Sequence, residues 1–299
     1  MLHYPPVNYI EPVFRPPSEA NSLILQVTNG CSWNNCTFCE MYTDPQKKFR
    51  PKPQDEILKE IQACAASLGA VRRVFLADGD AMALSFARLK TILLAIKEYL
   101  PSVSRVSSYC LPRNLKKKSV EELAELQALG LELLYVGAES GNDHILSKID
   151  KGETYNTTVD ALHKIKAAGI KSSVMIINGM GGANFSEQHA IDSARLVNET
   201  QPEYLATLVL FFRQGEEHFR KEFGDDFVMS SQMQLIQEME LFLSHLELEK
   251  TIFRSDHASN YLVLKGVLGR DKPKLLSMIQ RALSQDSSVF LRADSLRGL

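Results

Sequence analysis

Three of the five cysteines lie within nine residues of one another and are the side chains in this sequence best suited to metal chemistry. Their spacing is Cys31-x4-Cys36-x2-Cys39. Thiolates are soft ligands that bind iron–sulfur clusters and zinc. Three protein sulfurs cover three corners of a four-iron cube and leave the fourth iron open. The isolated trio therefore favours an open-site cluster.

Zinc is the alternative metal that this spacing leaves open. A structural zinc site usually takes four ligands in paired short spacings, and the sequence holds no second C-x2-C or H-x3-H pair. A fourth zinc ligand would come from a distant residue such as Cys110 or His257. The odd number of cysteines argues against a disulfide framework.

The cysteines follow the first of six predicted β/α units. Short β-rich runs alternate with segments of helical apolar spacing, which predicts a parallel sheet with right-handed crossovers. We expect strands at residues 22–28, 71–77, 105–109, 131–137, 171–177 and 204–210, and helices at 55–68, 86–100, 119–129, 157–168 and 187–198. The predicted fold class is α/β, a partial (β/α)6 barrel of the TIM type.

Beyond residue 213 the pattern changes to helices at 229–246 and 272–283, with at most a short strand at 251–253. The expected domains are a proline-rich lead (1–21), the partial barrel (22–212) and a mainly helical C-terminal extension (213–299).

Polar residues follow the ends of the predicted strands, which is where parallel α/β folds place their chemistry. They are Asp78-Gly79-Asp80 after the second strand, Ser107 to Cys110 at the third, Glu139-Ser140-Gly141 after the fourth and Asn178-Gly179 after the fifth. Each group also has a purely structural interpretation, as a turn, a helix cap or a strand residue.

Two of these groups and the cysteine loop resemble motifs of the radical S-adenosylmethionine (SAM) superfamily. The loop has Phe38 just before its last cysteine, as in that superfamily, but one residue more than the usual C-x3-C-x2-C. Asp78-Gly79-Asp80 resembles the glycine motif after the second strand, with DGD in place of a GGE-like run. The run from Val136 to Lys151-Gly152 is similar to the ESG segment of the oxygen-independent coproporphyrinogen oxidases, methylthiotransferases and Elongator-type enzymes.

The resemblance implies an oxygen-sensitive [4Fe–4S] cluster on Cys31, Cys36 and Cys39, with SAM chelating the open iron. Reductive cleavage of SAM would give a 5′-deoxyadenosyl radical that abstracts hydrogen from an unidentified substrate. The implied SAM contacts are Phe38, Asp78, Gly79, Asp80, Ser108, Glu139, Ser140, Lys151, Asn178 and Gly179, with Lys148 competing for the role of Lys151. An electron donor such as flavodoxin or ferredoxin is implied as a partner.

Several other positions keep two interpretations. Cys110, with Tyr109 beside it, would serve as a hydrogen donor to a substrate radical or simply as a buried apolar residue. The Arg254-to-Tyr261 segment, which is similar to the tails of poorly characterised iron–sulfur oxidoreductases of the superfamily, would face substrate or dock the tail. We expect His144, His163 and His189 at helix surfaces and Lys116-Lys117-Lys118 in a solvated loop.

Composition excludes some partners. The net charge of −2 gives no basic excess for binding nucleic acid. Residues 1–17 lack the apolar run of a signal peptide, and no stretch of about 18 apolar residues predicts a membrane span. We therefore expect a cytoplasmic enzyme. The alternative functions are a radical SAM-like binding protein without radical chemistry, such as a haem carrier, and a zinc-binding barrel protein.

Overall fold

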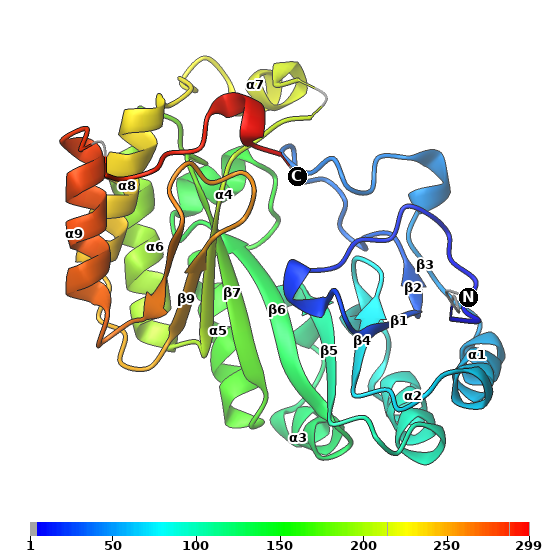
Figure 1. The fold of residues 1–299 in the computed structure, drawn as a ribbon. Coiled ribbons are helices and arrows are strands. Elements are labelled where there is room, and N and C mark those ends of the chain that lie inside the picture. The colour runs from blue at the N-terminus through cyan, green and yellow to red at the C-terminus, as the bar shows by residue number, and fades with distance from the viewer. Residues whose placement is uncertain (1–4, 214, 287, 299) are drawn as a thin grey trace. The chain divides into compact units, whose positions relative to one another are not determined.

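The computed structural model confirms the predicted alternation of strands and helices, and it describes residues 5–213, 215–286 and 288–298 (Figure 1). The described chain divides into two units. The first unit holds the residues up to Asn34, Met41–Val136 and His163–Ser172. The second unit holds Asn35–Glu40, Gly137–Leu162 and the residues from Ser173 onward.

The strands of the first unit pair in parallel, in the order β1-β4-β5-β6. Their bounds are β1 (Leu23–Gln26), β4 (Arg73–Ala77), β5 (Arg105–Cys110) and β6 (Leu131–Glu139), of which β6 enters the second unit at Gly137. The helices are α1 (Gln54–Ser67), α2 (Phe86–Tyr99) and α3 (Val120–Ala128). A short antiparallel ladder joins β2 (Thr28–Asn29) to β3 (Arg50–Pro51).

Local sequence accounts for these elements. The β4 residues from Val74 to Ala77 are all fully buried, which fits the continuous apolar run typical of a parallel strand covered on both faces. Ser119 and Glu122 form a capping box that starts α3.

The strands of the second unit are β7 (Lys171–Asn178, which enters this unit at Ser173), β8 (Tyr204–Val209), β9 (Ile252–Ser255) and β10 (Leu264–Val267). They follow this order in the sheet; β8 is parallel to β7 and to β9, whereas β10 is antiparallel to β9. The helices are α4 (Asp143–Lys148), α5 (Tyr155–Ala167, shared with the first unit from His163), α6 (Ser186–Thr200), α7 (Glu217–Phe223), α8 (Gln232–Ser244) and α9 (Lys272–Leu283).

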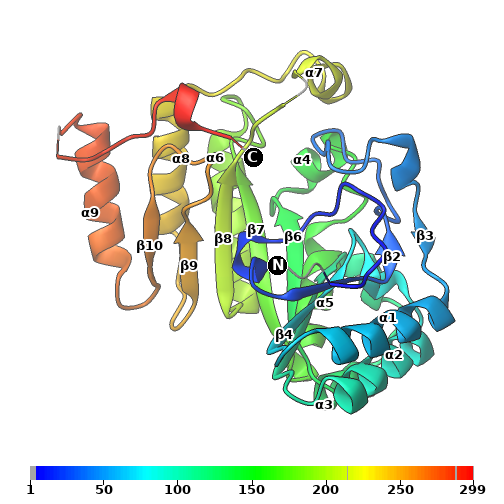
Figure 2. The ribbon, with the colours of Figure 1, turned by 45° about the vertical axis from the view of Figure 1, so that its right-hand side comes forward.

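The C-terminal extension therefore carries strands as well as helices. Figure 2 shows β9 and β10 beside β8, with α8 and α9 next to them. The short strand expected near 251–253 is present as β9, whereas no pattern in the sequence predicted β10. Only four residues long, β10 contains Lys265 and Gly266 and lacks an alternating apolar pattern.

An aromatic core lies in the second unit, where Phe219, Phe223 and Phe227 pack with apolar residues of α4 and of the loops after β7 and β8. Phe38 of the cysteine loop packs against this cluster. Within the described ranges, no helix is both long enough and apolar enough to span a membrane.

Candidate active site

The residues of the cysteine loop are divided between the two units. Cys31 belongs to the first unit, whereas Cys36 and Cys39 belong to the second, where the Cys39 amide donates to the Cys36 carbonyl at 3.1 Å. All three thiols are partly exposed, and none forms a disulfide. Among the described residues no three His, Cys, Asp or Glu side chains are gathered as metal ligands. The cluster assignment of the cysteines therefore stays a prediction.

Phe38 is held by packing. Its ring lies against the aromatic core of the second unit, and the Thr37 amide donates to the Ile149 carbonyl at 3.0 Å. These contacts fix the backbone between Cys36 and Cys39.

The Asp78-Gly79-Asp80 segment follows β4 and is deeply buried. The Asp78 carboxylate pairs with the Lys47 ammonium, and both side chains are fully buried. Asp80 accepts from the Ser32 hydroxyl and, at 3.3 Å, from the Asn114 amide. No sequence pattern marks Lys47, which is the first of two lysines in a polar stretch.

The two aspartates differ in whether both of their carboxylate oxygens have hydrogen-bond partners. Asp78 accepts hydrogen bonds through both carboxylate oxygens, whereas Asp80 Oδ1 is buried with no hydrogen-bond partner. Burial raises the pKa of the Asp80 carboxyl, although the Ser32 and Asn114 donors oppose that shift. A buried acceptor without a donor is costly, so Asp80 is the stronger candidate to bind a cationic or hydroxyl donor of a ligand.

Glu139 and Lys151 of the second unit lie together, as the ESG resemblance implies. Lys151 Nζ donates to Glu139 Oε1 at 2.8 Å, and both side chains are less than 10% exposed. Glu139 Oε2 is buried without a hydrogen-bond partner. Lys148 instead pairs with Asp226 at 3.6 Å, so Lys151 is the one of the two lysines that pairs with Glu139. Which of them meets the SAM carboxylate stays a prediction.

Gly137 makes room for this ion pair. A Cβ at this position would lie 2.2 Å from Glu139 Oε1 and 3.3 Å from Lys151 Nζ. Glu139 itself has a φ of +65°, a left-handed conformation that is uncommon for a residue with a side chain. This role of Gly137 was not predicted, although the glycine stands two residues before the glutamate.

Ser140 is committed to a buried hydrogen-bond network. Its hydroxyl lies 2.8 Å from His189 Nδ1 and accepts from the Asn142 amide at 3.0 Å. His189 Nε2 lies 2.9 Å from the Ile177 carbonyl. The expectation that His189 is a surface residue is wrong, because its face of α6 packs on the sheet; His144 and His163 are exposed as expected.

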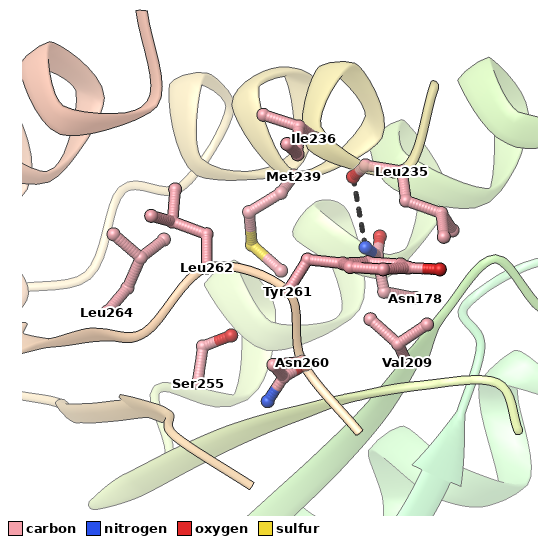
Figure 3. A pocket seen from close by; sticks show the side chains of 10 residues that line it. All are labelled: Asn178, Val209, Leu235, Ile236, Met239, Ser255, Asn260, Tyr261, Leu262 and Leu264. Carbon is pink, nitrogen blue, oxygen red and sulfur yellow. Dashed lines mark hydrogen bonds between the residues drawn. The ribbon is translucent and has the colours of Figure 1, made fainter. Parts of the chain in front are cut away.

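Asn178 and Gly179 end β7 and contact α8. The Asn178 amide donates to the Leu235 carbonyl at 3.0 Å (Figure 3). The Gly179 amide donates to Glu238 Oε1 at 2.6 Å, and a Cβ on Gly179 would lie 2.6 Å from Leu235 Cδ2. These two residues therefore fix the extension to the end of β7.

A narrow pocket lies beside Asn178 (Figure 3). Its volume of about 20 Å³ is enough for about one water molecule. Its lining comes from β7, β8, α8 and the extension: Asn178, Val209, Leu235, Ile236, Met239, Ser255, Asn260, Tyr261, Leu262 and Leu264.

Glu238 gives the stability of the protein a predictable dependence on pH. Burial raises the pKa of this carboxyl above its ordinary value of 4.5, against the opposing effects of His189, Ser186 and Gly179. A carboxyl whose pKa is higher in the folded protein than in the unfolded chain binds its proton more tightly in the fold. Its contribution to stability is present below the ordinary pKa and is lost as pH rises through the folded-state pKa. We expect Glu238→Gln to gain thermal stability relative to the wild type as pH rises above 4.5. Thermal unfolding of both proteins across pH 4.5–8 checks this; a constant difference would contradict it.

Tyr109 and Cys110 end β5. Tyr109 packs edge-on against Phe75 with ring centroids 5.1 Å apart, and Cys110 is 2% exposed. The Ser108 hydroxyl lies 3.1 Å from the Leu76 carbonyl of β4 and the Ser107 hydroxyl 3.4 Å from that of Val74. The catalytic role of Tyr109 and Cys110 stays a prediction.

The lysine run after β5 is only partly solvated. Lys118 is 7% exposed, and its ammonium donates to the Met82 carbonyl at 2.9 Å. The solvated-loop expectation is therefore wrong for Lys118 and right for Lys116 and Lys117, which are exposed.

The segment from Arg254 to Tyr261 docks the C-terminal tail. The Arg297 guanidinium stacks on the Tyr261 ring at 3.8 Å and donates to the Ser259 carbonyl at 2.7 Å. Asn260 donates to the Thr207 carbonyl of β8 at 2.9 Å. Of the two interpretations, these contacts favour the docking network.

Solved structures share this fold. Coproporphyrinogen III oxidase (HemN) from Escherichia coli matches 75% of this chain and 52% of its own at 17% identity, with a TM-score of 0.59. Methylornithine synthase (PylB) matches 76% of this chain and 63% of its own at 18% identity, with a TM-score of 0.51. The chain thus has the partial (β/α) barrel fold that the sequence predicted.

The profile of the radical SAM superfamily matches residues 25–194, more than half of the chain. The chain belongs to the radical SAM superfamily, as the cysteine loop and the ESG segment indicated. Members of this family use a [4Fe–4S] cluster and SAM, so the cofactors implied by the resemblance are those of the family.

The curated relatives match only part of this chain. A bacteriochlorophyllide d C-12(1)-methyltransferase of Chlorobaculum tepidum is 33% identical over 47% of this chain and 30% of its own. A tRNA-2-methylthio-N(6)-dimethylallyladenosine synthase of a Marinomonas strain is 26% identical over 71% and 48%, respectively. The haem chaperone HemW of Bacillus subtilis is 25% identical over 52% and 45%. The chain spans less than half the length of each of these relatives.

The residues of this chain fit the cofactors of the family. Three thiols in a short loop suit iron. Each unit also supplies a buried carboxylate oxygen without a hydrogen-bond partner, Asp80 Oδ1 in the first and Glu139 Oε2 in the second. Such oxygens can accept from the ammonium and hydroxyl groups that SAM carries.

Proposed function

We propose that this protein is a radical SAM enzyme that abstracts hydrogen from a small-molecule substrate. The observation that carries the proposal is the superfamily match over residues 25–194, which contains all three cysteines of the loop together with Asp80, Glu139 and Lys151. When bound, the reduced cluster and SAM supply the radical chemistry by cleavage to methionine and a 5′-deoxyadenosyl radical. The electron comes from a donor such as flavodoxin or ferredoxin, and the enzyme works in the cytoplasm.

The side chains have separate tasks in this proposal. Cys31, Cys36 and Cys39 hold the cluster. Asp80 accepts a hydrogen bond from the SAM ammonium through Oδ1, which the fold leaves available. A charge-assisted hydrogen bond in a buried site is stronger than a neutral one.

Glu139 is the second acceptor. Its Oε2 accepts from a ribose hydroxyl or the ammonium of SAM, while Lys151 holds Oε1 and supplies a positive charge for the SAM carboxylate. Phe38, Ser140, Asn178 and Gly179 act through the backbone that they anchor, because their own groups are engaged by packing or hydrogen bonds.

The test is anaerobic purification, reconstitution with iron and sulfide, reduction with dithionite and an assay for 5′-deoxyadenosine. The wild type should bind a brown cluster and form 5′-deoxyadenosine from SAM. A cluster- or haem-binding protein without SAM cleavage would support the carrier function and overturn ours. A colourless zinc protein would overturn the cluster itself.

Asp80→Asn tests the ammonium contact. Losing a hydrogen bond to a charged group should raise the KM for SAM by about ten- to a hundredfold, since such bonds contribute about 1.5–3 kcal/mol. The matched control is Asp55→Asn, which removes a carboxylate that is 73% exposed on α1 and should leave KM unchanged. An unaltered KM in Asp80→Asn, with the iron content intact, would remove Asp80 from the SAM site.

A further inference from the structure

Lys47 and Asp78 form an ion pair that is unusual for its complete burial. Both side chains are 0% exposed, although lysine and aspartate are almost never fully buried unless they are paired. The Lys47 ammonium also donates to the Ile10 carbonyl at 2.9 Å, and Asp78 accepts from the Tyr42 hydroxyl at 3.2 Å. Because an unpaired buried charge is strongly destabilising, each of these two side chains holds the other in position.

The next two residues also contact the cysteine-bearing segment. Gly79 lies against the Tyr42 ring, so that a Cβ on Gly79 would be 2.5 Å from Tyr42 Cζ. Asp80 accepts from the hydroxyl of Ser32, the residue after Cys31. Three consecutive residues at the end of β4 therefore hold the chain before and after the stretch that carries Cys36 and Cys39.

Further contacts close the same segment at its base. The side-chain amide of Asn29 (Nδ2) donates to the carbonyls of Gln46 at 2.6 Å and Lys48 at 3.0 Å. Gly30 has a φ of +70°, and a Cβ there would lie 1.9 Å from the Lys47 carbonyl oxygen. The Lys47 backbone is thus fixed beside Gly30 and its side chain beside Asp78.

We propose that the Lys47–Asp78 pair is a positioning device that clamps the cysteine loop to the end of β4. Asp78, the first residue of the Asp-Gly-Asp segment, is thus paired with a lysine that follows the cysteine loop. Clamping both flanks of the trio limits where its thiols can lie, which lowers the entropy lost when they bind one cluster. The clamp is a property of the polypeptide; its role in holding the cluster rests on the proposed function.

Hydrogen exchange of the metal-free protein tests the clamp directly. In Lys47→Met, the amides of residues 28–34 and 41–48 should exchange about tenfold faster or more than in the wild type, because local opening no longer breaks an ion pair. The matched control is Lys52→Met. Lys52 is 8% exposed and pairs with Glu60 at 2.8 Å outside the loop, so its loss should leave exchange in 28–34 and 41–48 unchanged. Unchanged exchange in Lys47→Met would overturn the proposal.

The double variant Lys47→Met/Asp78→Asn keeps the test decisive if the single variant fails to fold. It leaves no unpaired buried charge and should fold, yet its loop should still exchange fast. After reconstitution it should bind less than about half the iron of the wild type, with an altered EPR signal of the reduced cluster on SAM addition. Wild-type protection and a wild-type EPR signal in the double variant would overturn the clamp. A wild type that binds no cluster would instead refute the proposed function, while the exchange result still decides the clamp.

Discussion

Cys36→Ala is expected to lose both the iron–sulfur cluster and 5′-deoxyadenosine formation while keeping the fold. The Cys36 thiol is partly exposed in a loop, so its removal leaves no large cavity in a core. A three-cysteine site that loses one sulfur keeps two ligands, too few for a stable four-iron cluster. The measurements are iron and sulfide per chain, absorbance near the charge-transfer band of the cluster, and 5′-deoxyadenosine after reduction; circular dichroism reports the fold.

The matched control for Cys36→Ala is Cys64→Ala. Cys64 is fully buried in α1, and burial raises the pKa of its thiol to about 11, so it is not a thiolate ligand at neutral pH. Its removal should cost about 1–2 kcal/mol of stability and leave cluster and activity intact. An intact cluster in Cys36→Ala would show that the ligand assignment is wrong.

Lys151→Met is the substitution with the largest expected effect on stability together with SAM binding. It leaves the Glu139 carboxylate buried without its ion-pair partner, which costs about 3–5 kcal/mol when a buried pair is broken on one side. The free energy of unfolding, from thermal or denaturant melts, measures that loss. SAM affinity should fall as well, measured by equilibrium dialysis with the reconstituted protein.

Two further variants separate the effect of the ion pair on stability from its effect on SAM binding. Glu139→Gln/Lys151→Met has no unpaired buried charge and should recover most of the stability, but not SAM binding. Lys148→Met removes a lysine that is 29% exposed and pairs across 3.6 Å, so its effect should be within about 1 kcal/mol. Recovery of SAM binding in the double variant would show that the pair is only structural.

The barrel and the pair Glu139–Lys151 were predictable from sequence for physical reasons. Parallel strands buried on both faces give apolar runs with a turn signal at their ends, and these runs fixed all six strand positions within a few residues. Glu139 and Lys151 are twelve residues apart on either side of the short helix α4, and their pairing is a local event.

The contacts that the sequence analysis missed join residues distant in the chain. Lys47 meets Asp78 across 31 residues, and Gly179 meets Glu238 across 59. A buried lysine or histidine differs in no way from an exposed one in a single sequence, since its burial depends on the partner that neutralises or hydrogen-bonds it. The burial of Lys118 and His189 was misjudged for that reason.

The strand β10 ends the order of strands in the second unit and has only four residues. Its centre carries Lys265, an exposed side chain that pairs with Asp256 at 2.8 Å. A short border strand bearing a charge offers little backbone for another polypeptide to add to by hydrogen bonding. The border strand β10 thereby protects the sheet against edge-to-edge pairing with further copies, and so against aggregation.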